Sequence, residues 1–171
     1  MSQLLHHQDA VLEALEEGEN LDTIYLDFSK ASDKYDHGIL LHKIKTLGIK
    51  GKLGRWIYSF LTERFQEVLV KGRKSTRSHL KSGVPQGSVL GPILFLIYIS
   101  DIAEDLLANV LVYVDDTKLR HKVQTTEDVE FVQKELLKLH EWGIRNNMEF
   151  NSKKFQVVRY GADNDLKDET N

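Results

Sequence analysis

The sequence predicts one α+β domain, from its length, its composition and the order of its strand and helix patterns. The chain has 171 residues, of which 41% are hydrophobic and 29% are charged, with 2 prolines and 11 glycines. This composition excludes disordered, collagen-like and low-complexity proteins, and the length is sufficient for one buried core. Cysteine is absent, which excludes disulfide frameworks, thiolate zinc sites and cysteine nucleophiles. Any metal must therefore bind to oxygen or imidazole.

The first half of the chain predicts a helix, a strand, two further helices and a hairpin. The first helix covers residues 2–18, and its apolar positions at helical spacing are Leu4, Leu5, Val11, Leu12 and Leu15. Residues 23–28 alternate like a strand covered on one side, with Ile24, Leu26 and Phe28 on one face and Thr23, Tyr25 and Asp27 on the other. Helical patterns lie around residues 39–47 and 53–61, and residues 65–70 and 75–80 predict a hairpin that turns at residues 71–74.

The second half predicts a buried helix, two strands, a long helix and a last strand. Residues 82–87 form a loop that leads into a helix from residue 89 to about residue 107. Residues 109–114 are mostly apolar and β-branched, which predicts a central strand that ends at Asp115 and Asp116. Residues 117–123 pair back as a second strand, residues 125–128 form a capping box that opens a long helix, and residues 155–160 form the final strand. The tail, residues 161–171, is polar.

This order of elements brings three acidic side chains together. Without the first helix and the hairpin, it is a split βαβ arrangement of the ferredoxin-like kind, in which strands 23–28 and 109–114 become neighbours in a sheet that is open on one face. Adjacent strands lie about 4.8 Å apart. Asp27, Asp115 and Asp116 are therefore expected to converge, although 88 positions separate Asp27 from Asp115.

Three converging carboxylates predict a metal site. They repel one another, which favours bound divalent cations, and oxygen ligands favour Mg²⁺ or Mn²⁺ over zinc. Two such ions about 3.5 to 4 Å apart can polarise an attacking hydroxyl and stabilise a leaving oxygen, as in nucleotidyl transfer or nuclease chemistry. Taken singly, the same features also fit a simpler interpretation, with Asp115 and Asp116 in a solvated turn and residues 82–87 as a loop entering a helix.

The charge is unevenly distributed along the chain. The net charge of −3 is the sum of −7 over residues 1–36, +9 over residues 37–81 and −5 over residues 82–171. The basic segment suits a phosphate-rich partner, although it also fits a solvated surface. The longest apolar candidate, residues 89–99, contains Pro92 and is shorter than the roughly 18 to 20 residues that span a bilayer. With no secretory signal at the N-terminus, we expect an intracellular protein in the nucleus or cytoplasm, neither secreted nor in a membrane.

Four ordered motifs carry a family resemblance. Leu26-Asp-Phe-Ser-Lys-Ala31 and Asp36-His37 are followed by Ser82-Gly-Val-Pro-Gln-Gly-Ser-Val-Leu-Gly-Pro92, Tyr113-Val-Asp-Asp-Thr-Lys118 and Phe150-Asn-Ser-Lys-Lys154. They closely resemble motifs A, B, C and D of reverse transcriptases of the non-LTR, LINE-like retrotransposon type. The resemblance covers residues 2 to about 167, and the motif B run is its most specific part. It implies the ferredoxin-like palm of an RNA-directed DNA polymerase.

The resemblance also implies roles for individual residues. Asp27, Asp115 and Asp116 match the catalytic, metal-binding aspartates, with two Mg²⁺ or Mn²⁺ ions and the backbone carbonyl of Phe28 as a further ligand. Pro85, Gln86 and Gly87 match the loop that lies against the incoming dNTP and the template base. Lys154 matches the lysine that neutralises or protonates the pyrophosphate leaving group. The implied partners are an RNA template and a DNA primer, whose backbone would lie near residues 37–81.

The sequence departs from the family at several places. Ser32 stands where the family has an aromatic ring that blocks the 2′-hydroxyl of a ribonucleotide, so weaker discrimination against ribonucleotides is expected. Phe155 stands where the family commonly has cysteine. The fingers and thumb segments are largely missing, so we expect a truncated palm over residues 1–160 that needs those segments of a longer polyprotein for synthesis. The alternative is a non-catalytic nucleic-acid-binding remnant, or a decayed retrotransposon fragment without turnover.

Overall fold

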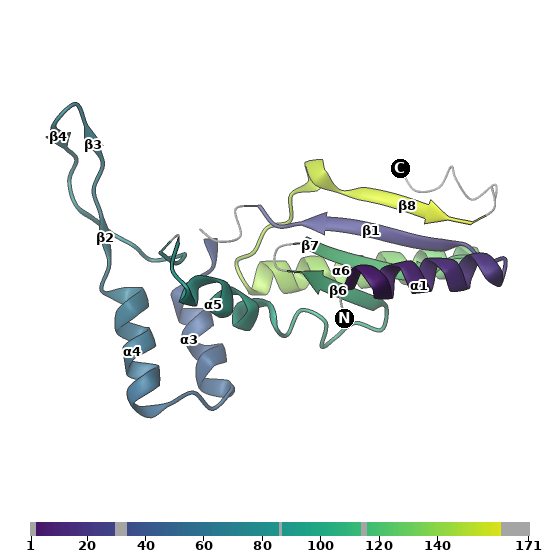
Figure 1. The fold of residues 1–171 in the computed structure, drawn as a ribbon, viewed down its shortest axis with the longest axis horizontal. Helices are drawn as coiled ribbons and strands as arrows, with labels where there is room; N and C mark the ends of the chain where they lie inside the picture. Colours follow the sequence, from purple (N-terminus) through teal and green to yellow (C-terminus); the bar gives the residue numbers. More distant parts are fainter. Residues whose placement is uncertain (1–2, 30–33, 86, 114–115, 162–171) are drawn as a thin grey trace. The chain divides into compact units, whose positions relative to one another are not determined.

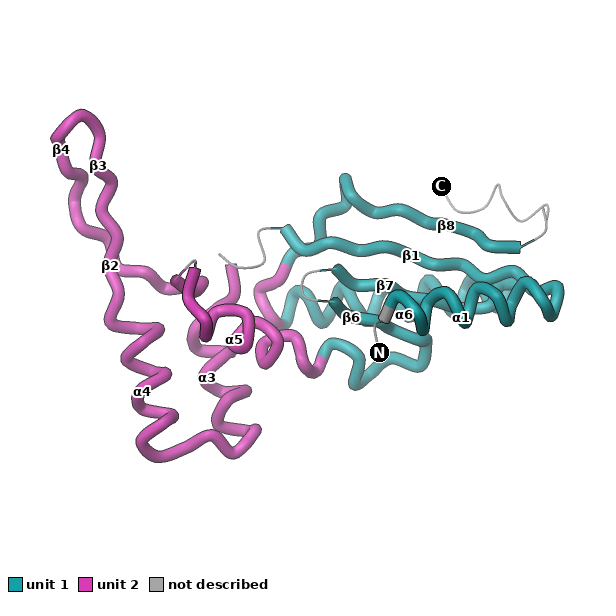
Figure 2. Tube along the Cα trace, viewed as in Figure 1, with its two compact units in different colours: residues 1–29, 102–145, 149–171 teal, residues 30–101, 146–148 magenta. Residues whose placement is uncertain are grey.

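The structure is a computed structural model that describes residues 3–29, 34–85, 87–113 and 116–161. The chain forms two compact units, shown in Figure 2. The first comprises residues 1–29, 102–145 and 149–171, and the second comprises residues 30–101 and 146–148. The assignment of residues 1–160 to one domain stays a prediction. Among the helices that the structure describes, none is both long and apolar enough to cross a membrane.

The first unit is built on an antiparallel sheet (Figure 1). Its strands are β1 (Leu21–Asp27), β6 (Asn109–Tyr113), β7 (Asp116–Lys122) and β8 (Gln156–Tyr160), in the spatial order β6-β7-β1-β8. The mixture of helices with this sheet confirms the predicted α+β class. The prediction that residues 109–114 form the strand next to β1 is wrong, because β7 lies between them. β7 buries Thr117 and Leu119, whereas β6 is a partly exposed edge strand.

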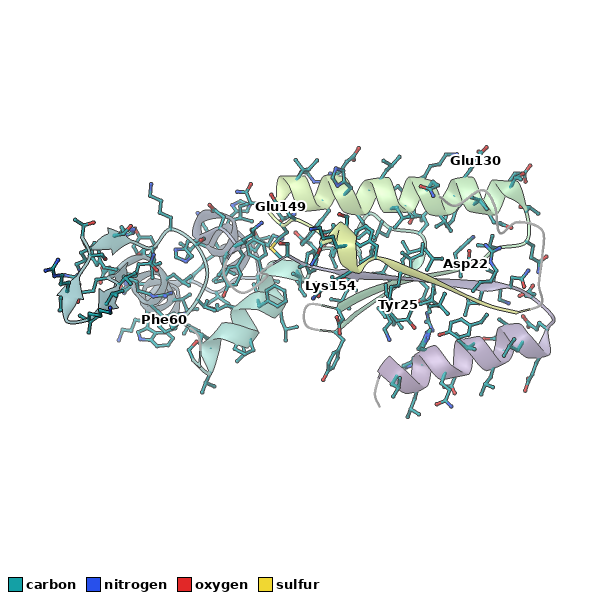
Figure 3. The ribbon with its side chains drawn as sticks, turned by 90° about the horizontal axis from the view of Figure 1, so that it is seen from above. Asp22, Tyr25, Phe60, Glu130, Glu149 and Lys154 are labelled. Atoms are coloured by element: carbon teal, nitrogen blue, oxygen red, sulfur yellow. The ribbon has the colours of Figure 1, made fainter. Side chains whose placement is uncertain are left out.

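Two helices of the first unit cover opposite faces of this sheet, as Figure 3 shows. Trp142 of α6 (Thr126–Arg145) lies with its ring centre 6.0 Å from that of Phe28, on one face. On the other face, α1 (Gln3–Glu16) places His7 Nε2 3.3 Å from the Tyr25 hydroxyl. Thr23 on this second face is completely buried. The expectation that this face of β1 is uncovered is therefore wrong along most of the strand.

α1 forms where the periodicity predicts it but packs through another side. The buried residues of the helix are His7 and Ala14. Four leucines of the predicted apolar face are instead 43 to 66% exposed, namely Leu4, Leu5, Leu12 and Leu15. The polar His7 faces the sheet because two tyrosine hydroxyls, of Tyr25 and Tyr160, lie within 3.5 Å of its ring.

The long helix α6 begins at the predicted capping box. The carboxylate of Asp128 accepts a hydrogen bond from the Thr125 backbone N–H at 2.9 Å, and the Thr125 hydroxyl accepts one from the Asp128 N–H at 3.3 Å. Bonds from the backbone N–H groups of Gln124 and Thr125 lower the pKa of Asp128. The reciprocal bonds satisfy amides at the helix start that lack partners within the helix.

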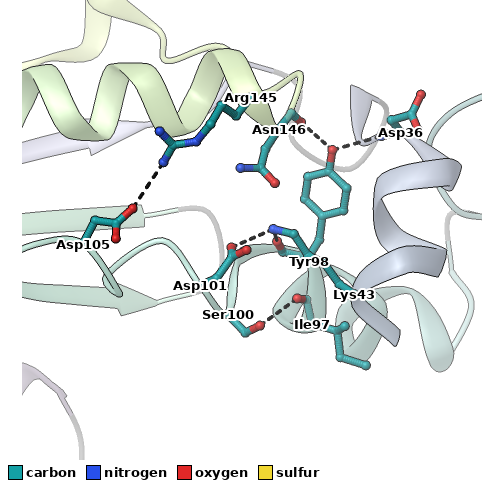
Figure 4. Close-up of polar contacts among 9 residues, drawn as sticks. All are labelled: Asp36, Lys43, Ile97, Tyr98, Ser100, Asp101, Asp105, Arg145 and Asn146. Carbon is teal, nitrogen blue, oxygen red and sulfur yellow. Dashed lines mark hydrogen bonds and ion pairs between the residues drawn. The ribbon is translucent and has the colours of Figure 1, made fainter. Parts of the chain in front are cut away.

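The second unit contains α3 (His37–Thr46), α4 (Gly51–Thr62) and α5 (Leu90–Ile99). Their buried apolar side chains include Leu40, Ile44, Ile57, Leu61 and Leu94. The helix predicted to run from residue 89 to about residue 107 ends at Ile99, followed by turns over residues 100–105. Asp101, just beyond the helix, lies 2.6 Å from Lys43 Nζ of α3, and the same ammonium donates to the Tyr98 carbonyl (Figure 4).

The hydroxyl of Tyr98, on α5, is hydrogen-bonded to two other segments of the second unit. It donates to the Asn146 carbonyl and accepts a 3.2 Å hydrogen bond from the Asp36 N–H (Figure 4). The Asp36 carboxylate caps α3, because it accepts hydrogen bonds from Gly38 and Ile39. Burial raises the pKa of Tyr98 to about 12, so its hydroxyl keeps its proton at neutral pH.

The hairpin after α4 consists of two short ladders. β2 (Phe65–Gln66) pairs with β5 (Ser78–His79), and β3 (Leu69–Val70) pairs with β4 (Arg73–Lys74). The hairpin is as predicted, but its turn consists of Lys71 and Gly72 alone, with φ of 47° and 78°. Positive φ at both central residues matches the twist of a two-residue hairpin. Arg73 and Lys74, predicted to lie in the turn, are therefore strand residues.

Candidate active site

Asp27 and Asp116 are direct cross-strand partners at the ends of β1 and β7. The Asp27 carbonyl accepts a 2.8 Å hydrogen bond from the Asn151 N–H, so the backbone groups of Asp27 point away from β7. The two aspartates therefore form a non-hydrogen-bonded pair, whose Cβ atoms lie about 4.5 to 5.5 Å apart. Two carboxylates at this separation share one site. Their mutual repulsion favours a cation between them.

Phe28 is fixed beside this pair. It is buried, its ring stacks on Phe150 with centres 4.6 Å apart, and the backbones of the two residues form an antiparallel bridge. The hydrogen bonds of this bridge are made by the neighbours of Phe28, at Asp27 and Ser29. Since backbone groups alternate along a strand, the Phe28 carbonyl points toward the β7 side. Two carboxylates and this carbonyl form an oxygen donor set of the type that Mg²⁺ and Mn²⁺ prefer.

Lys154 contacts the same aspartate. It is the last residue of the short 3-10 helix η1 (Ser152–Lys154), and its backbone N–H donates to the Asn151 carbonyl at 2.9 Å. Figure 3 shows Lys154 close to the end of β1. Its Nζ lies 2.8 Å from Asp27 Oδ2, with side-chain exposures of 62% for the lysine and 15% for the aspartate. The predicted pyrophosphate-binding lysine therefore lies against a predicted metal ligand.

The remaining predicted site residues lie either outside the described residues or in the second unit. Asp115, Gln86 and Ser32 lie outside the described residues. Within the described part of the chain, no group of three metal-ligating side chains comes together. Pro85 and Gly87 belong to the second unit, where the Ser88 N–H donates to the Pro85 carbonyl at 3.2 Å and Gly87 has a φ of 78°. A positive φ is a conformation that glycine adopts without strain.

Lys118 and Tyr25 share the sheet face with the aspartate pair, and the sequence reasoning did not single them out. Each lies two residues from an aspartate, Lys118 after Asp116 and Tyr25 before Asp27, and they are cross-strand partners. Lys118 Nζ lies 5.0 Å from the centre of the Tyr25 ring. Burial, followed by a hydrogen bond with Tyr160, raises the pKa of Tyr25 to about 12. The two-residue period of the strands, which already placed Tyr25 on the same face as Asp27, is the signal that could have added Lys118.

The family described as reverse transcriptase (RNA-dependent DNA polymerase) matches residues 4–167. The chain belongs to the reverse transcriptase family. This membership confirms the resemblance carried by the four motifs. The catalytic and metal-binding roles of the individual site residues stay predictions.

Curated relatives of this reverse transcriptase chain come from retrotransposons. It is 34% identical over 160 residues to the RNA-directed DNA polymerase from mobile element jockey of Drosophila melanogaster, covering 87% of this chain and 17% of that protein. It is 32% identical over 158 residues to the RNA-directed DNA polymerase from mobile element jockey of Drosophila funebris, again covering 87% of this chain and 17% of that protein. A probable RNA-directed DNA polymerase from transposon X-element of D. melanogaster is 28% identical over 164 residues, or 92% of this chain and 18% of that protein. The chain thus spans less than a fifth of these relatives.

Solved telomerase structures share the fold. Telomerase from Candida albicans, in complex with a fragment of telomeric RNA, matches with a TM-score of 0.71 at 16% identity, over 96% of this chain and 31% of that one. Apo telomerase from Candida tropicalis, truncated from its C-terminal domain, matches with a TM-score of 0.67 at 16% identity, over 91% and 35% of the two chains. At this identity the likeness establishes the fold of the chain.

Proposed function

We propose that this chain is the palm of an RNA-directed DNA polymerase, which transfers a nucleotide from a dNTP to the 3′-hydroxyl of a primer on an RNA template. The observation that carries the proposal is the direct pairing of Asp27 with Asp116 at the ends of neighbouring strands. The names of the curated relatives support the reaction class. In this proposal the palm comprises residues 1–160, followed by a tail at residues 161–171, and it works inside the cell with the fingers and thumb segments of a longer protein.

In the proposed reaction, Asp27, Asp115 and Asp116 hold two Mg²⁺ or Mn²⁺ ions, with the Phe28 carbonyl as a further ligand. When bound, these ions polarise the attacking hydroxyl and stabilise the leaving oxygen. Pro85, Gln86 and Gly87 place the nucleotide and the template base. Lys154 neutralises the negative charge that develops on the pyrophosphate.

The basic hairpin is the proposed contact for the nucleic-acid backbone. Its exposed cations include Lys71, Arg73, Lys74 and Arg77, and Arg77 stacks over the exposed ring of Phe65 at 4.4 Å. Cations that contact phosphates produce an affinity that falls steeply with salt.

Primer extension tests the catalytic proposal. We expect this palm, joined to the fingers and thumb segments of a longer protein, to extend a DNA primer on an RNA template in Mn²⁺ or Mg²⁺. In the same protein we expect Asp116→Asn to lower the rate by at least about 10²-fold, because a metal ligand is lost. Asp9→Asn, an exposed substitution of the same type on α1, serves as the matched control. Equal extension by wild type and Asp116→Asn would contradict the catalytic role.

Sugar selectivity tests the assignment of Ser32. We expect Ser32→Phe to raise the preference for dNTP over rNTP, because the ring would fill the space that a 2′-hydroxyl needs. The measurement is the ratio of incorporation rates with the two nucleotides on the same primer-template. An unchanged ratio would overturn the assignment.

The exposed basic hairpin also favours a second candidate, a non-catalytic protein that binds nucleic acid. This candidate predicts binding to an RNA–DNA hybrid that weakens steeply with salt and is unchanged in Asp27→Asn and Asp116→Asn. Fluorescence anisotropy across a salt series, combined with the extension assay, separates the two candidates. Salt-sensitive binding without extension supports the non-catalytic protein.

A further inference from the structure

We propose that Lys154 is a built-in counter-cation of Asp27 that a divalent metal must displace, so that Lys154 limits the metal affinity of the site. This inference rests on the proposed function, since it takes Asp27 as a metal ligand. It adds a second role to the lysine. Before metal binds, Lys154 neutralises the carboxylate that the metal later occupies.

The first step of the argument is the charge at the strand ends. Asp27 is largely shielded from solvent and lies directly opposite Asp116. Like charges at directly opposite positions destabilise a sheet. The 2.8 Å contact between Lys154 Nζ and Asp27 Oδ2 places a positive charge where it relieves this repulsion. The contact therefore stabilises the metal-free site.

The second step is that the lysine and a metal compete for one carboxylate. Mg²⁺ binds carboxylate oxygens at about 2.0 to 2.1 Å and accepts little deviation from its geometry. An ammonium 2.8 Å from Asp27 Oδ2 would lie within a few ångströms of a metal on that carboxylate. Two cations at such a separation repel strongly in a partly buried site. Metal binding at Asp27 is therefore expected to move the ammonium away.

The third step is that Lys154 can leave without disturbing the fold. Its side chain is 62% exposed, so the ammonium can turn into water. The backbone is held separately, because the Lys154 N–H bonds to the Asn151 carbonyl and the Asn151 N–H bonds to the Asp27 carbonyl. A rotation of the side chain moves the ammonium away from Asp27 while this backbone stays in place. The released ammonium stays near the site because its backbone is fixed there, and it can then form an ion pair with an anionic leaving group.

Direct measurement of Mn²⁺ binding tests the proposal. Electron paramagnetic resonance of free Mn²⁺ gives the dissociation constant for the full chain without any need for activity. We expect Lys154→Gln to bind Mn²⁺ about two- to fivefold more tightly than wild type, because a partly exposed ion pair no longer competes. Lys154→Arg keeps the charge and should stay close to wild type. Lys153→Gln, at the neighbouring exposed lysine, removes the same charge and should change the affinity less than twofold.

The outcomes separate this inference from the proposed function. If Asp27→Asn does not weaken Mn²⁺ binding, the metal site of the proposed function fails. If binding depends on Asp27 but Lys154→Gln binds no more tightly than wild type, the displacement proposal alone fails. An absence of binding by both wild type and Lys154→Gln also overturns it.

Thermal unfolding provides a second readout. In EDTA, Lys154→Gln should lower the melting temperature of wild type by a few degrees, and it should have a smaller effect in an Asp27→Asn background. Saturating Mn²⁺ should remove this difference, because the metal then replaces the lysine. Equal effects of Lys154→Gln in both backgrounds would contradict the pairing on which the proposal stands.

Discussion

Glu135 is a buried carboxylate of α6 that holds the segment before β6 in place. Its side chain is only 1% exposed. One of its oxygens accepts hydrogen bonds from the backbone N–H groups of Leu107 at 2.6 Å and Ala108 at 2.9 Å, and the other lies 2.6 Å from Lys138 Nζ. Removing this carboxylate should therefore destabilise the first unit.

The expected loss follows from the exposure of each partner. The Ala108 N–H is buried, so leaving it unpaired costs about 1 to 3 kcal/mol. The Leu107 residue is largely exposed and Lys138 is partly exposed, so each can turn to water at a cost of about 0.5 to 1 kcal/mol. We therefore expect Glu135→Ala to lower the free energy of unfolding by about 2 to 5 kcal/mol.

Urea unfolding followed by circular dichroism measures this loss. Glu130→Ala, also on α6, is the matched control, since Glu130 is exposed and its contact with Lys134 is 3.9 Å long (Figure 3). The control should stay within about 0.5 kcal/mol of wild type. A loss below about 0.5 kcal/mol for Glu135→Ala would refute the reasoning, because the buried amide would then have found another partner.

The same carboxylate predicts a dependence of stability on pH. Burial by itself raises the pKa of Glu135, but the hydrogen bonds from Lys138, Ala108 and Leu107 outweigh it and lower the pKa below its ordinary value of 4.5. The stability that Glu135 contributes is therefore present above about pH 4.5 and is lost as the pH falls through the lowered pKa. Unfolding free energies measured between pH 6 and 3 should fall more steeply for wild type than for Glu135→Gln, and parallel curves would contradict the assignment.

Three further predictions concern other sites. Tyr98→Phe removes the hydroxyl that joins two backbone groups of the second unit and should cost about 1 to 2 kcal/mol by urea unfolding, whereas no loss would show that water replaces the hydroxyl. Burial, aided by nearby cations, lowers the pKa of His7 from 6.5. The stability that the neutral His7 contributes is therefore present above about pH 6.5 and is lost on acidification. Between pH 7 and 5, the melting temperature of His7→Gln should change less than that of wild type. Gly161→Ala, just after β8, should destabilise the first unit by at least about 1 kcal/mol, because the residue has a φ of 137° and a Cβ would lie 2.9 Å from the backbone carbonyl oxygen of Glu19. An unchanged melting temperature would show that this backbone can shift.

Much of the local structure could be predicted because its signals lie close together in the chain. The capping box at Thr125 and Asp128, the strand at residues 23–28 and the hairpin near residue 71 all form where the pattern places them. Such signals depend on side-chain period and turn geometry within a few residues. Their exact ends were less predictable. The helix that begins at Leu90 ends eight residues before the predicted end near residue 107.

The candidate site was predictable in its members and less so in its contacts. Asp27, Asp116 and Lys154 stand out through ordered motifs. Asp27 and Asp116 do come together in the sheet, but through the pairing of β1 with β7 and not through the predicted pairing of β1 with residues 109–114. The contact between Lys154 and Asp27 had no such signal. It depends on a backbone bridge between residues 28 and 150, which lie more than a hundred positions apart.

The sequence alone determined the family, the α+β class and the residue types of the site, because these follow from motifs and local periodicity. Tertiary structure decided three other features: β7 rather than β6 lies beside β1, α1 packs through His7 rather than through its leucines, and Lys154 lies against a predicted metal ligand. Each depends on partners that are distant in the chain. The energy of such contacts comes from burial, charge and hydrogen bonding that exist only once the segments meet.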